Sequence, residues 1–103
     1  MIATIATIVL MAASMQAAAS ASRQQFVACL KQSVEKANAG KMKSENFGAF
    51  ARTNCAAQID SFKQGLVSFD LKNGVARKRA ESDADLQIED YLIGASEKVH
   101  PDS

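Results

Sequence analysis

The sequence contains one histidine and two cysteines among its 103 residues. The histidine, His100, lies near the chain end, where segments are usually frayed. The sequence has no nucleophile elbow, no glycine-rich phosphate loop and no Cys or His pair at zinc spacing. It also shows neither the alternation of a strand nor a repeat of about 20 to 50 residues. We therefore expect a protein that is not an enzyme, has no cofactor or metal, and is neither a β protein nor a solenoid.

The first 21 residues have the pattern of a secretory signal. Residues 2–15 carry no charge, small residues follow, and the first charged side chain is Arg23. This order is typical of an apolar core and a signal peptidase site. We expect cleavage after Ala21, with Ala19 as the alternative and a retained leader as the minority case. The apolar run is shorter than the ~20 residues that span a bilayer, so we expect residues 22–103 to form one small exported domain, periplasmic or extracellular, without a membrane span.

Cys29 and Cys55 lie thirteen residues on either side of Met42. If two helices fold back on each other around Met42, residues equidistant from the turn meet at the same level. An exported chain enters an oxidising compartment, and two cysteines allow only one pairing within the chain. We therefore predict a Cys29–Cys55 disulfide, worth roughly 3 to 4 kcal/mol in the chain-entropy treatment.

Apolar residues recur at helical spacing in residues 23–39 and again in residues 45–72. The first stripe comprises Phe26, Leu30, Val34 and Ala37, and the second comprises Phe47, Ala51, Cys55, Ile59, Phe62, Leu66 and Phe69. Gly40 is suited to the left-handed conformation that often ends a helix, and Ser44 is suited to cap the next one. The sequence thus predicts a small all-α fold, in which a disulfide joins an antiparallel helical hairpin.

A third helix is predicted for residues 75–93, after the turn pair Asn73-Gly74. Its apolar residues divide between two sides. Ala76, Ala80, Ala84, Ile88 and Tyr91 share one side, and Val75, Leu86 and Ile93 lie roughly opposite. The second group either contacts a protein partner or becomes partly buried when this helix docks obliquely on the hairpin.

Charge is unevenly distributed along the chain. Residues 22–79 have a formal net charge of +7 and residues 80–103 a net charge of −6. We expect the acidic third helix to lie against the basic hairpin, and Arg77 to pair locally with Glu81. Acidic residues directly follow the basic run at residues 77–79 and would repel a phosphate backbone, so a nucleic acid partner is not expected.

Residues 26–29, Phe-Val-Ala-Cys, are similar to the lipobox of bacterial lipoproteins, in which a small residue precedes a cysteine that becomes lipid-modified. Phe26 stands where Leu is usual, and Arg23 interrupts the apolar run that a lipobox normally closes. The resemblance implies a lipid on Cys29, which would leave Cys55 unpaired. It remains an alternative to the disulfide.

Two functions fit these features. The first is a non-enzymatic binding or structural module of the bacterial cell envelope that acts through contact with another protein. The second is a periplasmic stress chaperone or inhibitor, whose hairpin opens in acid and exposes Phe47, Phe50, Phe62 and Phe69. Acid would protonate the C-terminal carboxylates and remove the negative charge that faces the basic half. The sequence leaves the partner and the oligomeric state open.

Overall fold

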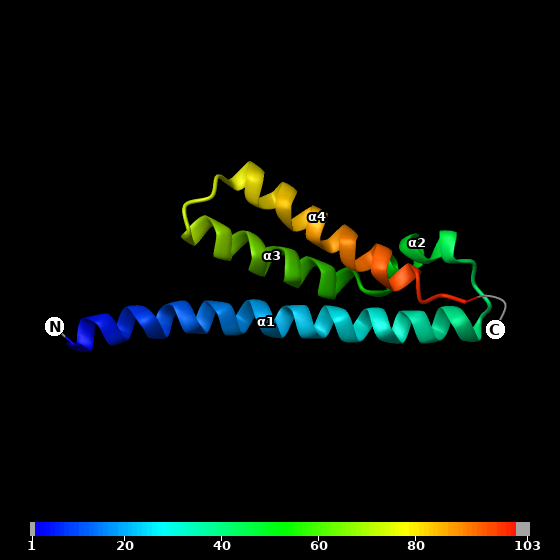
Figure 1. Ribbon diagram of the computed structural model, residues 1–103, viewed down its shortest axis with the longest axis horizontal. Helices are drawn as coiled ribbons and strands as arrows, with labels where there is room; N and C mark the ends of the chain where they lie inside the picture. The colour runs from blue at the N-terminus through cyan, green and yellow to red at the C-terminus, as the bar shows by residue number, and fades with distance from the viewer. Residues whose placement is uncertain (1, 101–103) are drawn as a thin grey trace.

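The computed structural model describes residues 2–100, with side chains from residue 20 onward. Within this range it is entirely helical, which confirms the predicted fold class. The helices are α1 (Ile2–Ala39), α2 (Ser44–Asn54), α3 (Ala56–Lys72) and α4 (Arg77–Ser96) (Figure 1). Over residues 2–100, none of the helices has both the length and the apolarity needed to cross a membrane. The predicted signal peptide falls within α1, which continues without a break through the expected cleavage site.

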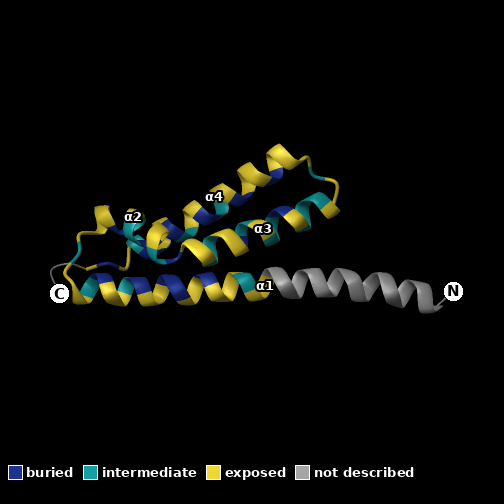
Figure 2. Cartoon of the chain, turned by 180° about the vertical axis from the view of Figure 1, so that it is seen from behind, coloured by how far each residue is buried: buried dark blue, intermediate teal, exposed yellow. Residues whose placement is uncertain are grey.

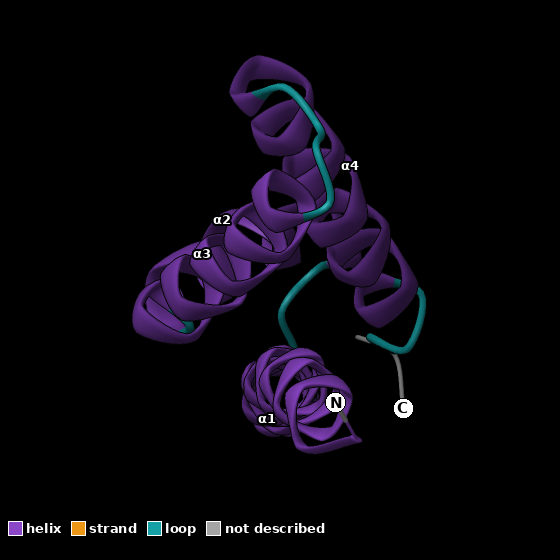
Figure 3. Ribbon diagram, turned by 90° about the vertical axis from the view of Figure 1, so that its left-hand side faces the viewer, coloured by secondary structure: helices purple, strands orange, loops and turns teal. Residues whose placement is uncertain are grey.

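Three long helices pack side by side, and α3 runs antiparallel to both α1 and α4 (Figure 1). The short α2 lies beside the C-terminal end of α1. Seen end-on, α1 lies on one side of the α3–α4 pair (Figure 3). The predicted hairpin is therefore present, with the last helix packed against it.

The core lies where the apolar stripes of the four helices meet (Figure 2). Its largest fully buried side chains are Phe26, Phe47 and Phe62, one from each of the first three helices. A smaller cluster joins Val67 of α3 to Ala80 of α4 and their neighbours. Val67 and Leu71, which fall outside the predicted stripes, thus belong to this cluster rather than being left bare.

The turn after α1 uses a different residue from the one predicted. Lys41, not Gly40, has a positive φ, of 55°. The Met42 N–H donates to the Ala37 carbonyl at 2.8 Å, and the Lys41 N–H donates to the Asn38 carbonyl at 3.2 Å. These two bonds are those of a Schellman motif, in which the residue after the C-cap takes the left-handed conformation. Gly40 is the C-cap, so the prediction was wrong by one residue.

The start of α2 also differs from the prediction. The N-cap is Lys43, and no side chain makes a capping hydrogen bond there. Ser44 is instead the first residue of the helix. The first turn contains Glu45, whose carboxylate interacts favourably with the helix dipole.

The predicted single helix over residues 45–72 is two helices, divided at Cys55. This residue has φ −113° and ψ 23°, outside the helical region. The Cys55 N–H still donates to the Ala51 carbonyl, and the Ile59 N–H to the Cys55 carbonyl. One bond ends at Cys55 and the other begins there, and this single residue separates the two helices. Because the helices follow each other directly, the apolar pattern gave no sign of the break.

The turn between α3 and α4 follows the prediction. Gly74 has a φ of 85°, and the Val75 N–H donates to the Asp70 carbonyl at 2.9 Å. Here a glycine occupies the left-handed position, where a side chain would cost energy. The following helix, α4, begins and ends slightly later than the predicted residues 75–93.

Candidate functional site

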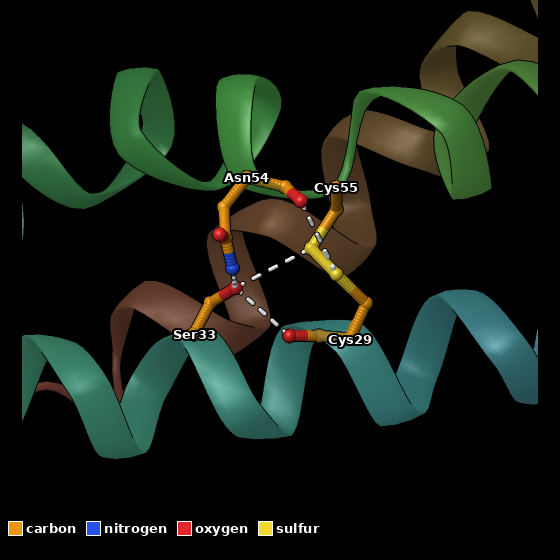
Figure 4. The surroundings of a disulfide bond; sticks show 4 residues. All are labelled: Cys29, Ser33, Asn54 and Cys55. Atoms are coloured by element: carbon orange, nitrogen blue, oxygen red, sulfur yellow. Dashed lines mark hydrogen bonds between the residues drawn. A yellow bond between two sulfur atoms is a disulfide. The ribbon is translucent and has the colours of Figure 1, made fainter.

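The predicted disulfide between Cys29 of α1 and Cys55 is formed, with the two Cα atoms 5.9 Å apart (Figure 4). The Cys55 side chain is fully buried, and Cys29 is 8% exposed. The bond ties the break between α2 and α3 to the middle of α1. In this oxidised protein the Cys29 sulfur is bonded to Cys55 and is not free to carry a lipid.

Ser33 lies one turn after Cys29 and is the buried polar residue of the core (Figure 4). Its hydroxyl donates to the Cys29 carbonyl at 2.8 Å and accepts from Asn54 Nδ2 at 2.8 Å. The same oxygen lies 3.3 Å from the Cys55 sulfur. Sequence analysis did not identify Ser33 or Asn54, although the spacing of Ser33 from Cys29 places both on one face of α1.

An aromatic cluster near the disulfide joins α1, α3 and α4. The ring centroids of Phe26, Phe62 and Tyr91 lie 5.5 to 5.8 Å from one another. The Arg23 guanidinium lies over the Phe62 ring at 5.6 Å, a cation–π distance. The cluster fixes the position of α4 relative to α1 and α3.

Ion pairs hold α4 on the α2–α3 side. Arg52 pairs with Glu89, and Lys63 pairs with Asp85 at 2.8 Å. The hydrogen bond from Lys63 to the Asp85 carboxylate raises the pKa of Lys63 above its ordinary value of 10.5. These contacts confirm that the acidic helix lies against the basic hairpin.

Two further ion pairs lie within α4. Arg77 pairs with Glu81 at 3.8 Å, as predicted, and Arg79 pairs with Asp83 at 3.7 Å. Both pairs join residues four apart on the exposed face of the helix, where such pairs contribute little to stability. The positive charges of the basic run are thus partly neutralised by acids of the same helix.

The flank of α4 opposite the ion pairs with α2 and α3 borders an open groove. This groove lies between α4 and α1 and has a volume of about 980 Å³. Its apolar lining consists of Val27, Leu30, Val34, Tyr91, Gly94 and Ala95. Val27 is 42% exposed, unusual for a residue of this type on a packed helix. The lining of the groove is predominantly apolar, as in binding sites generally.

Charged residues also line this groove. They are Lys31 and Glu35 on α1, Asp90 on α4, and Glu97 and Lys98 just past the end of α4. All five side chains are exposed, and among residues 20–100 none of them forms an ion pair. This contrasts with the α2–α3 side of α4, where the acids are paired with basic side chains.

Gly94 lies within α4 and lines the groove. A Cβ atom added there would meet no other atom within 4 Å, so no close packing inside the chain requires a glycine. A glycine in a helix interior costs roughly 1 kcal/mol relative to alanine. At this position it leaves the backbone of α4 open to close approach from the groove.

The three predicted partner-contact residues lie in different surroundings. Val75 packs against the cluster of Val67 and Ala80 and is partly buried. Leu86 and Ile93 are 63% and 50% exposed. They are seven positions apart, so they share the outer face of α4, and neither of them lines the groove. Only these two are left on the surface.

Among the described residues, no group of three or more His, Cys, Asp or Glu side chains could hold a metal ion. Comparison of the chain with known protein families, with curated proteins and with solved structures finds no match.

Proposed function

We propose that this protein is a non-enzymatic binding module of the bacterial cell envelope, which holds another polypeptide in the groove between α1 and α4. The single observation that carries the proposal is the apolar groove itself, with exposed Val27 on one wall and bare Gly94 on the other. Concave clefts with a mostly apolar lining are characteristic of binding sites.

The disulfide supports the same role. It joins α1 to the break between α2 and α3, and the aromatic cluster joins α1 to α4. The disulfide lies outside the groove lining, and the aromatic cluster holds α4 through Tyr91, which is itself part of the lining. A wall held in this way loses little conformational freedom when a partner binds, and preorganisation of this kind favours affinity.

Site-specific photocrosslinking tests the proposal. A photoreactive phenylalanine derivative is introduced at Val27 in the groove, at Leu86 on the outer face of α4, or at the exposed Ala57 of α3. The protein is then expressed in an exporting bacterium. We expect light-dependent adducts with an envelope protein from position 27 and none from position 57. Adducts from position 86 alone would place the binding surface on the outer face of α4 and overturn the groove assignment.

A second candidate function is an acid-opened chaperone or inhibitor, favoured by the ion pairs that join α4 to α2 and α3. Protonation of Glu89 and Asp85 would remove both pairs and weaken the cover over the core aromatic rings. In this case an apolar dye should bind at pH 3 and not at pH 7. Equal dye binding and helicity at the two pH values would exclude this candidate and leave the binding module.

A further inference from the structure

We infer that the α1–α4 groove takes one amphipathic α-helix of a partner protein, with Lys or Arg residues beside its apolar stripe. This inference rests on the proposed function and names the chemistry of the partner. It depends on the length of the groove, the bare backbone at Gly94 and the charges that line the walls.

The length of the groove suits a short helix. Within α4 the lining extends from Gln87 to Ala95, which at 1.5 Å per residue is about 12 Å, and Glu97 and Lys98 continue it past the end of the helix. A helix of about three turns covers this distance and presents two or three apolar side chains to the lining. Helical segments that lie in apolar grooves are a recurring mode of recognition.

Small residues on the α4 wall allow this helix to approach closely. Gly94 and Ala95 are adjacent in the groove lining, and the space beside Gly94 is empty. Packed helices come within about 8 to 10 Å of each other, at the short end where small residues lie at the contact. An incoming apolar side chain can therefore fill the space that a Cβ atom would occupy.

The charges of the groove favour a basic helix. The lining contains three acids and two lysines. Asn38 Nδ2 donates to the Lys98 carbonyl at 3.3 Å, so Glu35 and Glu97 lie near the same end of the groove on opposite walls. A Lys or Arg of the partner at this end would pair with either carboxylate, and Asp90 offers a third partner further along.

A second copy of this chain is a poorer occupant. The exposed apolar residues that it could present, Leu86 and Ile93, lie on a face of α4 that also carries Asp90 and Glu97. Docking that face in the groove would bring these acids toward Glu35 and Glu97, and like charges in contact oppose association. With three acids against two lysines in the lining, a basic partner is the more favourable occupant.

Binding of model peptides to the oxidised protein tests this inference. The probes are fluorescent amphipathic peptides of about 18 residues, one built from Leu and Lys and the other from Leu and Glu, and the readout is anisotropy. We expect the Leu/Lys peptide to bind at least about tenfold more tightly than the Leu/Glu peptide. A double variant, Glu35→Gln with Glu97→Gln, should reduce this preference. Equal affinity of the two peptides would overturn the inferred chemistry.

A matched pair of glycine variants tests the location. Gly94→Leu adds a side chain at a position where a Cβ atom meets nothing, and leucine has a higher helix propensity than glycine. The variant should therefore fold and lose at least about tenfold in affinity for the Leu/Lys peptide. Gly48→Leu makes the same change in α2, where a Cβ atom also meets nothing, and should bind as the wild type does. Circular dichroism checks that both variants are folded. An unchanged affinity in Gly94→Leu would refute the inference.

Other occupants give distinct outcomes. If laurate competes with the Leu/Lys peptide, the groove is an acyl-chain site. If the protein self-associates and Gly94→Leu abolishes this, the occupant is a second copy. Either result would overturn the inference. If the Leu/Lys peptide does not bind although position 27 crosslinks to an envelope protein, the inferred chemistry is wrong and the proposed function stands. If neither occurs, both fail.

Discussion

At the scale of single residues, the hydroxyl of Ser33 has the most consequential position. It is fully buried and bonds to the Cys29 carbonyl and to the Asn54 side chain, beside the Cys55 sulfur. A buried hydrogen-bonding group stabilises a fold mainly because leaving its partners unsatisfied is costly. Ser33 therefore helps to hold the break between α2 and α3 against α1.

Ser33→Ala should lower the free energy of unfolding by roughly 1 to 3 kcal/mol, because Asn54 Nδ2 loses its acceptor. Urea unfolding measures the change. The matched control is Ser82→Ala, on the exposed face of α4, which should have an effect close to zero. Equal effects of the two substitutions would show that the buried hydroxyl contributes nothing specific.

Lys41→Gly should stabilise the protein by about 1 kcal/mol. Lys41 has a φ of 55°, and the left-handed conformation costs a residue with a side chain roughly 1 to 2 kcal/mol that glycine avoids. Gly74→Ala is the converse change, at a φ of 85°, and should destabilise by a similar amount. Thermal unfolding of both variants checks the prediction, and shifts of the same sign would contradict it.

At the scale of elements, α4 has different environments on its two flanks. The flank facing α2 and α3 is held by Arg52–Glu89 and Lys63–Asp85, whereas the flank facing α1 borders the groove. The local pair Arg77–Glu81 was predictable from helical spacing, but the two pairs between helices depend on how α4 crosses its neighbours. The helix is thus anchored on one side and open to a partner on the other.

The Lys63–Asp85 pair should make the free energy of unfolding depend on pH in the alkaline range. The pKa of Lys63 is raised in the folded protein. The stabilisation by this pair is therefore complete below pH 10.5 and is lost as the pH rises through the higher folded-state pKa. The Lys63→Gln variant should therefore lose less stability than the wild type between pH 9 and pH 12, by urea unfolding. Lys72→Gln, an exposed lysine outside the ion pairs, is the control and should follow the wild type.

At the scale of the whole molecule, one covalent bond and one core hold four helices together. The disulfide spans 26 residues of sequence and joins α1 to the break that precedes α3. The aromatic cluster adds a contact among α1, α3 and α4. Domains of this size have a modest core and a small net stability. The cross-link therefore contributes a large share of the free energy of unfolding.

Replacing both cysteines by alanine should lower the free energy of unfolding by about 3.5 kcal/mol, the loop-entropy value for a separation of 26 residues. Urea unfolding measures the loss. Intact mass with and without a dithiol reductant provides the control, since reduction of one disulfide adds about 2 Da and a lipid would add hundreds. An unchanged unfolding midpoint in the double variant would show that packing alone holds the hairpin.

The sequence by itself determined the helical class, the disulfide partners and the turn at Gly74. These follow from local spacing, from the presence of only two cysteines and from the conformational freedom of one glycine. Sequence analysis also identified Leu86 and Ile93 as a candidate partner face, and the structure leaves both exposed. Each of these features depends on neighbours along the chain or on simple counting.

Only the tertiary structure decided the break at Cys55, the left-handed Lys41 and the groove between α1 and α4. The break occupies a single residue between two helices, so the apolar pattern of the sequence gave no sign of it. The groove joins Val27 to Gly94, which lie on helices that are not consecutive in the chain. Its existence depends on the angles at which helices cross, and these are set by side-chain packing between elements rather than by the pattern within one.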